Sequence, residues 1–366
     1  MSRTSTPGAG PRWLSVIVPC RNERGHIEAF CRAARSQDLP AGWRVEVLVA
    51  DGRSDDGTRE WLQGFCPGTQ GQAVEFILLD NPRRSAAAGL NVCIARARGD
   101  VLVRWDVHTT YAPDYWVQCL QTLERTGADN VGGPWKAVGH SSTQQAIAAA
   151  FQSRWVAGGA RSRDPQYDGP VDTVYLGCWP RATFERFGGF DEALVRNQDD
   201  EHNLRLSKGG ARIWQSSRIR STYVPRARVA QLRQQYLQYG YWKPFVMKKH
   251  GQPASLRHLV PGLFVATWSA LGLLAALAGG LEAARGAASA WAPWAWGAWL
   301  GVSAAYALAL GGLTLAAGVG SGAAVFVRLP AVIATYHLAY GWGFLRGAWD
   351  AWVRGRSDPD FGRLTR

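Results

Sequence analysis

The feature that most constrains the fold is a long stretch near the C-terminus, residues 259–345, which is almost free of charge and rich in Ala, Gly, Leu and Trp. Such a composition is typical of helices that face lipid. Two segments within it, 262–281 and 293–320, hold no charged residue, and each is long enough to cross a bilayer at roughly 20 residues per crossing. A third apolar segment, 323–345, contains Arg328. The sequence therefore predicts a membrane region in the last third of the chain.

The charges that flank this region predict its topology and its surroundings. The net charge is +13, from 41 basic and 28 acidic residues, and many of the basic residues lie on either side of the apolar stretch. Three full crossings would put the Arg-rich tail, residues 347–366, outside the cell, against the tendency of positive residues to stay inside. We therefore expect two spans, with the third segment re-entrant or interfacial. The basic flanks favour membrane lipid, rather than nucleic acid, as a partner.

The N-terminal residues and the cysteines bear on the compartment. Residues 1–12 contain no apolar core of a signal peptide. The six cysteines are scattered without the spacing of metal ligands, which favours reduced, buried thiols. We therefore expect a multi-pass protein of the inner (cytoplasmic) membrane whose N-terminal domain is cytoplasmic.

Short apolar runs alternate with helix-like stretches in the first part of the chain. The runs that we interpret as strands are 14–18, 45–50, 74–79 and 101–105. This alternation favours a mostly parallel sheet with right-handed crossovers. Ligands of such sheets bind outside the carboxyl ends of the strands, so the residues that directly follow each run are the candidates for a site.

One such residue is Asp51, which follows the second run. Its carboxylate can accept hydrogen bonds from a uracil N–H or a ribose hydroxyl. The alternative is that one of the polar residues after it, Ser54, Asp55 or Asp56, caps a helix that begins near Thr58. Both interpretations can hold at once.

Asp106 and His108 follow the fourth run. On an extended segment, alternate residues point the same way, so we expect the two side chains to lie on one side. A carboxylate and an imidazole could hold a divalent ion that bridges a diphosphate and offsets the charge of a leaving group.

A third acidic cluster opens a predicted helix over residues 199–208. Glu201 is placed to pair with Arg205 one turn later, so we assign it mainly to helix stability. Asp199 is the better candidate for a base that removes a proton from an acceptor hydroxyl.

The segment 226–258 mixes aromatic and basic side chains. This pattern suits a helix that lies on anionic lipid headgroups. Stacking on nucleic acid is the competing interpretation, and the apolar segments that follow disfavour it.

The motifs taken together resemble those of a known family. They are V-P-C-R-N-E at 18–23, D-G-R-S-D-D-G-T at 51–58, Asn91 with Gly99-Asp100, Asp106-Val-His108, G-G-F-D at 188–191 and Q-D-D-E-H-N-L-R-L at 198–206. In this order they resemble the family 2 glycosyltransferases, and among these the succinoglycan-type glucosyltransferases of bacterial exopolysaccharide synthesis. The resemblance implies an α/β fold: a GT-A catalytic domain, Rossmann-like with a mostly parallel sheet, followed by an α-helical membrane region. The expected boundaries are 13–225 for the catalytic domain, 226–258 for the interfacial segment, 259–346 for the membrane helices and 347–366 for a basic cytoplasmic tail.

The resemblance also implies roles for individual residues. The nucleotide-sugar would be bound by Pro19, Arg21, Glu23, Asp51, Ser54, Asn91 and Asp106. Asp106 and His108 match the family's metal-binding position, which implies Mg²⁺ or Mn²⁺, and Asp199 matches the inverting base. To the acceptor side we assign Gly177, Asp200 and Trp242.

Three positions depart from the family's pattern. His108 replaces a second Asp, and Gln198 replaces a Glu beside the base. Tyr241 stands where the signature of processive synthases has Arg, so we do not expect a polymer channel.

These features predict an inverting, metal-dependent glycosyltransferase at the cytoplasmic membrane face. It would move a sugar, such as glucose, from a UDP-sugar to a polyprenyl-linked acceptor in exopolysaccharide or glycolipid synthesis, alongside other polysaccharide-assembly proteins. One alternative is a polyprenyl-phosphate monosaccharide synthase. Another is a membrane scaffold with a catalytically degenerate nucleotide-binding domain, which the departures at His108 and Gln198 would suit.

Overall fold

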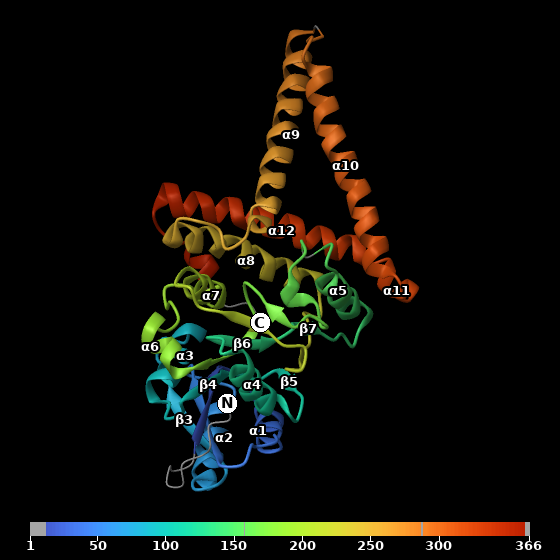
Figure 1. The fold of residues 1–366 in the computed structure, drawn as a ribbon. Helices are drawn as coiled ribbons and strands as arrows, with labels where there is room; N and C mark the ends of the chain where they lie inside the picture. Colours follow the sequence, from blue (N-terminus) through green and yellow to red (C-terminus); the bar gives the residue numbers. More distant parts are fainter. Residues whose placement is uncertain (1–11, 157, 287, 363–366) are drawn as a thin grey trace. The chain divides into compact units, whose positions relative to one another are not determined.

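The computed structural model describes residues 12–156, 158–286 and 288–362 (Figure 1). Residues 1–11, where we expect no signal peptide, lie outside the described residues, as does the end of the basic tail. The chain divides into two compact units. The first unit comprises Met1–Lys136, Asp164–Leu194 and Gln198–Tyr223, and the second comprises Ala137–Arg163, Val195–Asn197 and Val224–Arg366.

The first unit is built on an eight-stranded sheet with the order β3-β2-β1-β4-β9-β6-β10-β8. Its strands are β1 (Arg12–Cys20), β2 (Trp43–Asp51), β3 (Val74–Asp80), β4 (Val101–Arg104), β6 (Asn130–Gly133), β8 (Gly169–Pro170), β9 (Tyr175–Pro180) and β10 (Ile213–Gln215). The first four strands pair in parallel, and β9 runs antiparallel to both of its neighbours. The predicted mostly parallel α/β sheet is therefore confirmed.

The helices of this unit connect and cover the strands. They are α1 (Ile27–Arg35), α2 (Thr58–Phe65), α3 (Ala86–Arg96), α4 (Tyr115–Thr126), α6 (Arg181–Phe187) and α7 (Gln198–Lys208). A smaller sheet has the order β5-β11-β7, with β5 at Thr109–Tyr111, β11 at Ser221–Tyr223 and β7 at Lys136–Ala137.

Apolar side chains cover both faces of the large sheet. Val16 and Ile17 are neighbours on β1 but belong to different hydrophobic clusters, because successive strand residues point to opposite faces. The first cluster includes Trp105, and the second includes Trp179. Burial on both faces explains why the parallel strands are nearly continuous apolar runs in the sequence.

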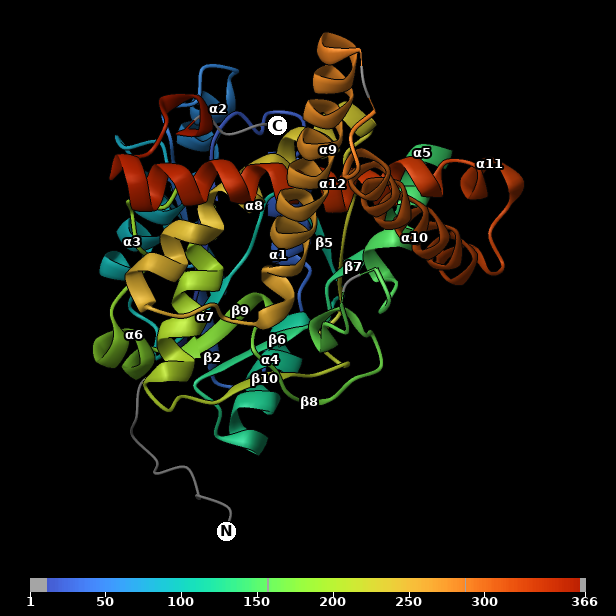
Figure 2. The same cartoon turned by 90° about the horizontal axis from the view of Figure 1, so that it is seen from above.

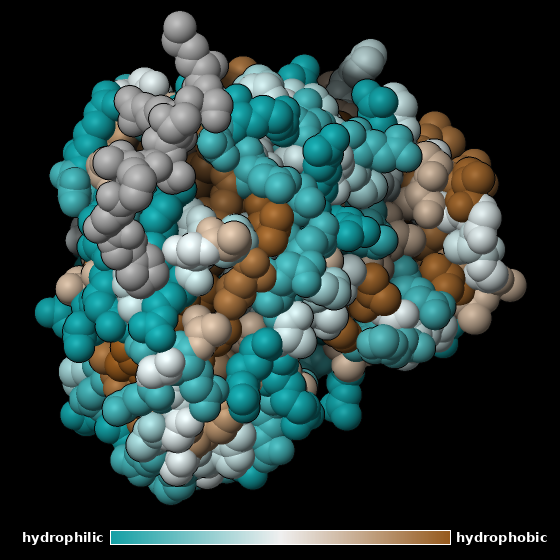
Figure 3. All heavy atoms as spheres, turned by 60° about the horizontal axis from the view of Figure 1, so that its bottom comes forward, coloured by the Kyte–Doolittle hydropathy of each residue, from teal (hydrophilic) through white to brown (hydrophobic). Residues whose placement is uncertain are grey.

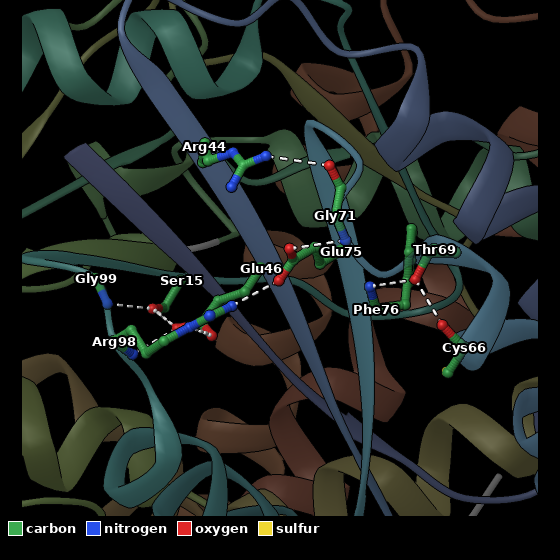
Figure 4. Close-up of polar contacts among 10 residues, drawn as sticks. All are labelled: Ser15, Arg44, Glu46, Cys66, Thr69, Gly71, Glu75, Phe76, Arg98 and Gly99. Carbon is green, nitrogen blue, oxygen red and sulfur yellow. Dashed lines mark hydrogen bonds and ion pairs between the residues drawn. The ribbon is translucent and has the colours of Figure 1, made fainter. Parts of the chain in front are cut away.

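A polar network crosses the sheet away from the carboxyl ends of the strands (Figure 4). Glu46 on β2 is fully buried, and it accepts hydrogen bonds from the Ser15 hydroxyl (2.6 Å) and from Nε of Arg98 (2.8 Å). Arg98 also donates to Glu75 on β3 (2.7 Å), and the Ser15 hydroxyl accepts from the Gly99 amide (2.8 Å). The network ties three strands to the start of β4, and it compensates a carboxylate that would otherwise be costly to bury.

The second unit is helical. Its helices are α5 (Ser142–Gln152), α8 (Val229–His250), α9 (Val260–Arg285), α10 (Ala292–Gly318), α11 (Ala323–Phe326) and α12 (Leu329–Trp349). Three helical stretches are long and apolar enough to cross a membrane: Leu256–Arg285, Ala292–Gly318 and Ala323–Arg354. Within this unit, α9 and α10 form a helical hairpin that projects from the pair formed by α8 and α12 (Figures 1 and 2).

Glycines allow α8 and α12 to pack closely. A Cβ on Gly343 of α12 would lie 2.1 Å from the Leu237 carbonyl oxygen, and one on Gly240 of α8 would lie 2.1 Å from that of Tyr340. The apolar part of the α12 segment is 33% buried, against 6% for α10, so α12 is covered more by protein. The prediction that the third segment is re-entrant or interfacial stays a prediction.

Exposed large apolar side chains gather in this helical unit. Most of those in the described part of the chain lie between Leu256 and Val353, with Leu308 79% exposed and Trp294 81% exposed. The face of the molecule drawn in Figure 3, by contrast, is largely hydrophilic. A helical hairpin with this much exposed apolar surface is typical of a membrane-spanning element.

Candidate active site

Asp51 and Ser54 meet at the end of β2. Asp51 is fully buried, and its carboxylate accepts from the Ser54 hydroxyl (2.5 Å), the Ser54 amide (3.2 Å) and the Arg59 guanidinium (3.0 Å). The same Arg59 group donates to Asp80 at the end of β3 (3.0 Å). Arg59 escaped the sequence reasoning because it lies inside a helix, outside every motif. The structure thus brings two predicted nucleotide ligands together and adds a cation.

The loops that follow β1 and β2 are joined by side chains. Backbone amides of Asn22, Glu23 and Arg24 donate to Ser54 Oγ (2.8 Å), Thr58 Oγ1 (2.9 Å) and Asp56 Oδ2 (3.0 Å), respectively. Asp56 also accepts from the amide and hydroxyl of Thr58, where α2 begins. The capping interpretation is therefore supported, since Asp56 bonds the start of α2. The role of Asp51 as a nucleotide ligand stays a prediction, and Ser54 holds its carboxylate in place. The loop with Pro19, Arg21 and Glu23 is thereby held beside Asp51.

Three of these loops contain a residue with a left-handed backbone. Asn22, Arg53 and Arg84 follow β1, β2 and β3 and have φ values of +53°, +56° and +59°. Left-handed φ is unfavourable for residues other than Gly, and such strain tends to gather at functional sites. A Cβ on Gly52 would lie 3.3 Å from the Arg21 side chain and 3.4 Å from the Arg84 backbone. The three loops therefore meet at the carboxyl edge of the sheet.

The end of β4 differs from the sequence-based prediction. The strand ends at Arg104, and residues 107–108 form a turn rather than an extended segment. Trp105 and Tyr111 stack with ring centroids 3.7 Å apart, and the Tyr111 hydroxyl bonds both the amide (2.7 Å) and the carbonyl (3.1 Å) of Asp106. The buried stack closes the turn, which explains why alternation does not continue past Asp106.

Asp106 and His108 have different partners within the turn. His108 is 53% exposed, and its Nδ1 lies 3.7 Å from Glu23 Oε1. The Asp106 carboxylate accepts from Nε (3.2 Å) and Nη2 (3.3 Å) of Arg104. The structure therefore brings His108 to the predicted nucleotide residue Glu23, and Asp106 to an arginine.

Arg104 is a residue of the site that the sequence reasoning did not assign a role. Burial lowers its pKa, but the negative charges of Asp106 and Asp199 and the Tyr175 phenol outweigh that effect, so the pKa of the Arg104 guanidinium is raised. Arg104 thus interacts with the acid at the end of β4 and with the candidate base on α7. A charged residue inside an apolar strand was the signal in the sequence.

Helix α7 holds Asp199 near its first turn. The predicted pair of Glu201 and Arg205 is confirmed, with N–O distances of 2.9 and 3.1 Å and Glu201 fully buried. Arg205 also donates to the carbonyls of Phe187 and Gly189, which anchors α7 to the loop after α6. Glu201 therefore stabilises α7 through Arg205, as expected. Asp199 stays the candidate for the general base.

Asn91 on α3 forms hydrogen bonds with the loop that follows α6. Its amide donates to the Phe190 carbonyl (2.8 Å) and to Glu192 (2.8 Å), and its oxygen accepts from the Phe190 amide (2.8 Å). Both ends of the side-chain amide thus have protein partners. Its assignment to the nucleotide stays a prediction.

Comparison with known proteins identifies the chain. The sequence model described as glycosyl transferase family 2 matches residues 15–181. The chain is 35% identical over 248 residues to the succinoglycan biosynthesis protein ExoA of Rhizobium meliloti (strain 1021), covering 67% of this chain and 73% of that protein. The chain belongs to the family 2 glycosyltransferases.

A second relative is also a glycosyltransferase, and a solved structure shares the fold. The family 2 chain is 24% identical to the dolichyl N-acetyl-alpha-D-glucosaminyl phosphate 3-beta-D-2,3-diacetamido-2,3-dideoxy-beta-D-glucuronosyltransferase of Methanococcus voltae, covering 65% of this chain and 74% of that protein. The fold of the present chain is similar to that of the mannosyltransferase PcManGT from Pyrobaculum calidifontis, solved in complex with GDP-Man and Mn²⁺. The TM-score is 0.58 at 20% identity, over 94% of this chain and 89% of that one. The expected GT-A fold of a family 2 enzyme is confirmed.

The acceptor-side residues of this glycosyltransferase have partners of their own. Gly177 has a φ of +99°, and a Cβ there would lie 2.3 Å from the Trp179 ring, so the position requires glycine. Asp200 is half-buried and donates its amide to Asp199 Oδ1 (3.0 Å). Trp242 belongs to the second unit, where it is 3% exposed and its indole N–H donates to the Phe361 carbonyl (3.1 Å). A role of these residues toward the acceptor stays a prediction.

Proposed function

We propose that this glycosyltransferase is an inverting, divalent-metal-dependent enzyme that moves a sugar from a UDP-sugar, such as UDP-glucose, to a polyprenyl-linked acceptor. The observation that supports it most is the position of Arg104, which interacts with both Asp106 and Asp199. These two carboxylates come from distant parts of the sequence, yet the negative charge of each raises the pKa of the same guanidinium. Sugar transfer requires this proximity, because the leaving diphosphate and the attacking hydroxyl act on the same anomeric carbon.

In this proposal the nucleotide binds along the ends of β1 and β2. Asp51 would accept hydrogen bonds from the base or the ribose, with Ser54 and Arg59 holding its carboxylate in place. Pro19, Arg21 and Glu23 would line the same side, since their loop is bonded to the loop after β2. The loops would therefore be largely preorganised before the nucleotide binds.

The residues present could hold a divalent ion only if the donor supplied further ligands. Among the residues that the structure describes, no group of three or more His, Cys, Asp or Glu side chains could hold a metal. Asp106 and His108 offer one carboxylate and one imidazole, and Mg²⁺ often takes its remaining ligands from substrate phosphates and water. When bound, Mg²⁺ or Mn²⁺ would supply positive charge against the departing diphosphate.

Asp199 is the proposed general base. It would take the proton from the acceptor hydroxyl while the oxygen forms the new bond to the anomeric carbon and the nucleoside diphosphate leaves on the opposite face. Attack from the opposite face inverts the configuration at that carbon. The anchoring of α7 through Glu201 and Arg205 would keep the carboxylate at a fixed position.

The proposed acceptor follows from the helical unit and from the relatives. The hairpin of α9 and α10 exposes apolar side chains over most of its length, which suits an enzyme of the cytoplasmic face of the inner membrane. One relative takes part in succinoglycan biosynthesis, and another is named for a dolichyl phosphate carrying a sugar. We therefore place the enzyme in exopolysaccharide or glycolipid synthesis, with a lipid-linked sugar as acceptor.

A donor and acceptor screen tests this proposal. The purified full-length chain in lipid nanodiscs would be mixed with UDP- or GDP-sugars and with polyprenyl phosphate, a polyprenyl diphosphate sugar or a membrane lipid extract. We expect UDP release that requires a divalent ion and the sugar-bearing lipid. Transfer to bare polyprenyl phosphate alone would instead identify a polyprenyl-phosphate monosaccharide synthase, and turnover only with GDP-sugars would contradict the assigned donor.

A further inference from the structure

Asp106, the acid assigned to the metal, is held by a cation of the protein itself. Both oxygens of its carboxylate accept from Arg104, at 3.2 and 3.3 Å. Arg104 is 9% exposed, and only 19% of the Asp106 side chain is exposed. This contact between guanidinium and carboxylate is bidentate and largely shielded from water. Such a contact is stronger than an ion pair on the surface.

The backbone fixes this pair. Arg104 is the last residue of β4, and Asp106 follows two positions later, on the same side of the chain. The main chain of Asp106 is held at both its amide and its carbonyl by the Tyr111 hydroxyl, whose ring stacks on Trp105. The main chain of Asp106 therefore cannot move away without disturbing a buried aromatic stack.

Arg104 also interacts with two further groups of the site. It interacts with Asp199 and with Tyr175, whose hydroxyl lies 2.8 Å from Thr109 Oγ1. A divalent ion that approached Asp106 alone would have to displace the guanidinium or sit beside it, and like charges at short range in a shielded site repel strongly. A diphosphate that arrived with the ion would offset that repulsion.

We propose that Arg104 is a positioning residue that blocks Asp106 from a divalent ion until a nucleotide diphosphate is present, and so makes metal binding depend on the donor. The inference rests on the proposed function, because it takes Asp106 as the metal-binding acid. Thermodynamic linkage requires the reciprocal effect: the ion must strengthen nucleotide binding by the same factor by which the nucleotide strengthens ion binding. Replacing Arg104 with a neutral residue should therefore tighten binding of the ion alone and weaken the coupling.

The test measures Mn²⁺ binding rather than turnover. Free Mn²⁺ would be titrated by electron paramagnetic resonance against the full-length chain in nanodiscs, with and without UDP. For Arg104→Met we expect Mn²⁺ affinity without UDP to rise about tenfold, within the range of typical coupling energies, and the gain from adding UDP to shrink. Mn²⁺ affinity without UDP that stays equal to or falls below that of the unmodified protein would overturn the proposal.

Three further variants make the result specific. Arg104→Gln keeps a hydrogen-bond donor beside Asp106 and should change Mn²⁺ affinity in the same direction, so the test survives if Arg104→Met fails to fold. In an Asp106→Asn background, Arg104→Met should no longer tighten Mn²⁺ binding, and tightening there would contradict a role through Asp106. Arg125→Met removes an arginine that pairs with Asp168 at 3.2 Å, and it should leave Mn²⁺ binding unchanged.

Binding of UDP and Mn²⁺ by the unmodified protein separates the proposed function from the role of Arg104. If the unmodified protein binds neither UDP nor Mn²⁺ with UDP, the metal-dependent function is wrong, and the role of Arg104 falls with it. If it binds Mn²⁺ equally well with and without UDP, the function stands and the role of Arg104 is wrong.

Discussion

His202 lies one turn after Asp199 on α7, but its surroundings give it a different role. The ring is fully buried, with centroids 4.7 Å from Phe190, 5.4 Å from Phe184 and 6.0 Å from Trp179. Burial, with a smaller contribution from Arg205, lowers the pKa of His202 to about 3. The imidazole is therefore neutral near pH 7 and acts as a packing residue on the buried side of α7.

This pKa predicts how stability depends on pH. Because the folded state disfavours the protonated ring, the stability from neutral His202 is complete above the ordinary histidine pKa of about 6.5 and is lost as the pH falls from there toward 3. At pH 5 the loss should be about 2 kcal/mol. His202→Phe should reduce the difference in unfolding free energy between pH 7 and pH 5 by about that amount.

Urea unfolding at the two pH values checks the prediction. His26→Gln is the control, because His26 is exposed and should leave the pH dependence unchanged. If His202→Phe retains the full loss of stability at pH 5, the ring is not the group responsible.

Some residue-level features follow from the sequence, and others do not. The pair of Glu201 and Arg205 was predictable because residues four apart on a helix are neighbours. The pairing of Asp106 with Arg104 was not, since it depends on where β4 ends and on the Trp105 stack. The partners of Asn91 lie in a loop about 100 residues later in the chain, and no local sequence pattern predicts such contacts.

At the scale of elements, glycine decides how α8 and α12 pack. A Cβ at Gly343 would lie 2.1 Å from the Leu237 carbonyl oxygen, and one at Gly347 would lie 2.0 Å from that of Tyr241. Backbone atoms cannot rotate away as a side chain can, so the helices would have to separate. These helices therefore owe their close approach to the absence of side chains.

Gly343→Ala should destabilise the helical unit. Although alanine favours helix by about 1 kcal/mol relative to glycine, the overlap with a backbone oxygen should cost about 2 kcal/mol or more. We expect a clear drop in the thermal unfolding midpoint in detergent. Gly311→Ala is the matched control, because nothing lies within 4 Å of a Cβ there and its midpoint should stay the same or rise. Equal midpoints for the two variants would contradict the packing described.

The Glu46 network in Figure 4 gives a second element-scale prediction. Arg98→Met would remove the main charge partner of a fully buried carboxylate that lies between β1 and β3. Breaking a buried ion pair costs about 3–5 kcal/mol, and because the Arg98 side chain is 42% exposed we expect a smaller loss of about 2 kcal/mol. Denaturant unfolding measures it. Arg32→Met, at a side chain that is 74% exposed, should change stability by less than about 0.5 kcal/mol, and a similar small change for Arg98→Met would contradict this account.

The sequence predicts the parallel strands better than the remaining ones. The apolar runs at 14–18 and 74–79 lie inside β1 and β3, because strands buried on both faces need continuous apolar residues. By contrast, β9 pairs antiparallel between β4 and β6 and contains left-handed backbone at Leu176 and Gly177. Its position depends on long-range pairing, which no local periodicity reveals.

At the scale of the whole molecule, a hydrophilic catalytic unit and an apolar helical unit share one chain. The three apolar helical stretches predict firm attachment to a membrane. Washing membranes with alkaline carbonate should leave the full-length protein in the pellet, because that treatment removes proteins held only by charge. Recovery in the supernatant would show that the basic residues, rather than the apolar helices, hold it.

The central claim is that Asp199 removes the acceptor proton in a site that binds the donor independently. The most direct measurement compares Asp199→Asn with the unmodified enzyme, recording sugar transfer to the lipid acceptor and UDP binding on the same preparation. The account predicts that kcat falls by about 10²–10⁴-fold, the usual contribution of a general base, while UDP binding is unchanged. Near-normal turnover with intact UDP binding would contradict it.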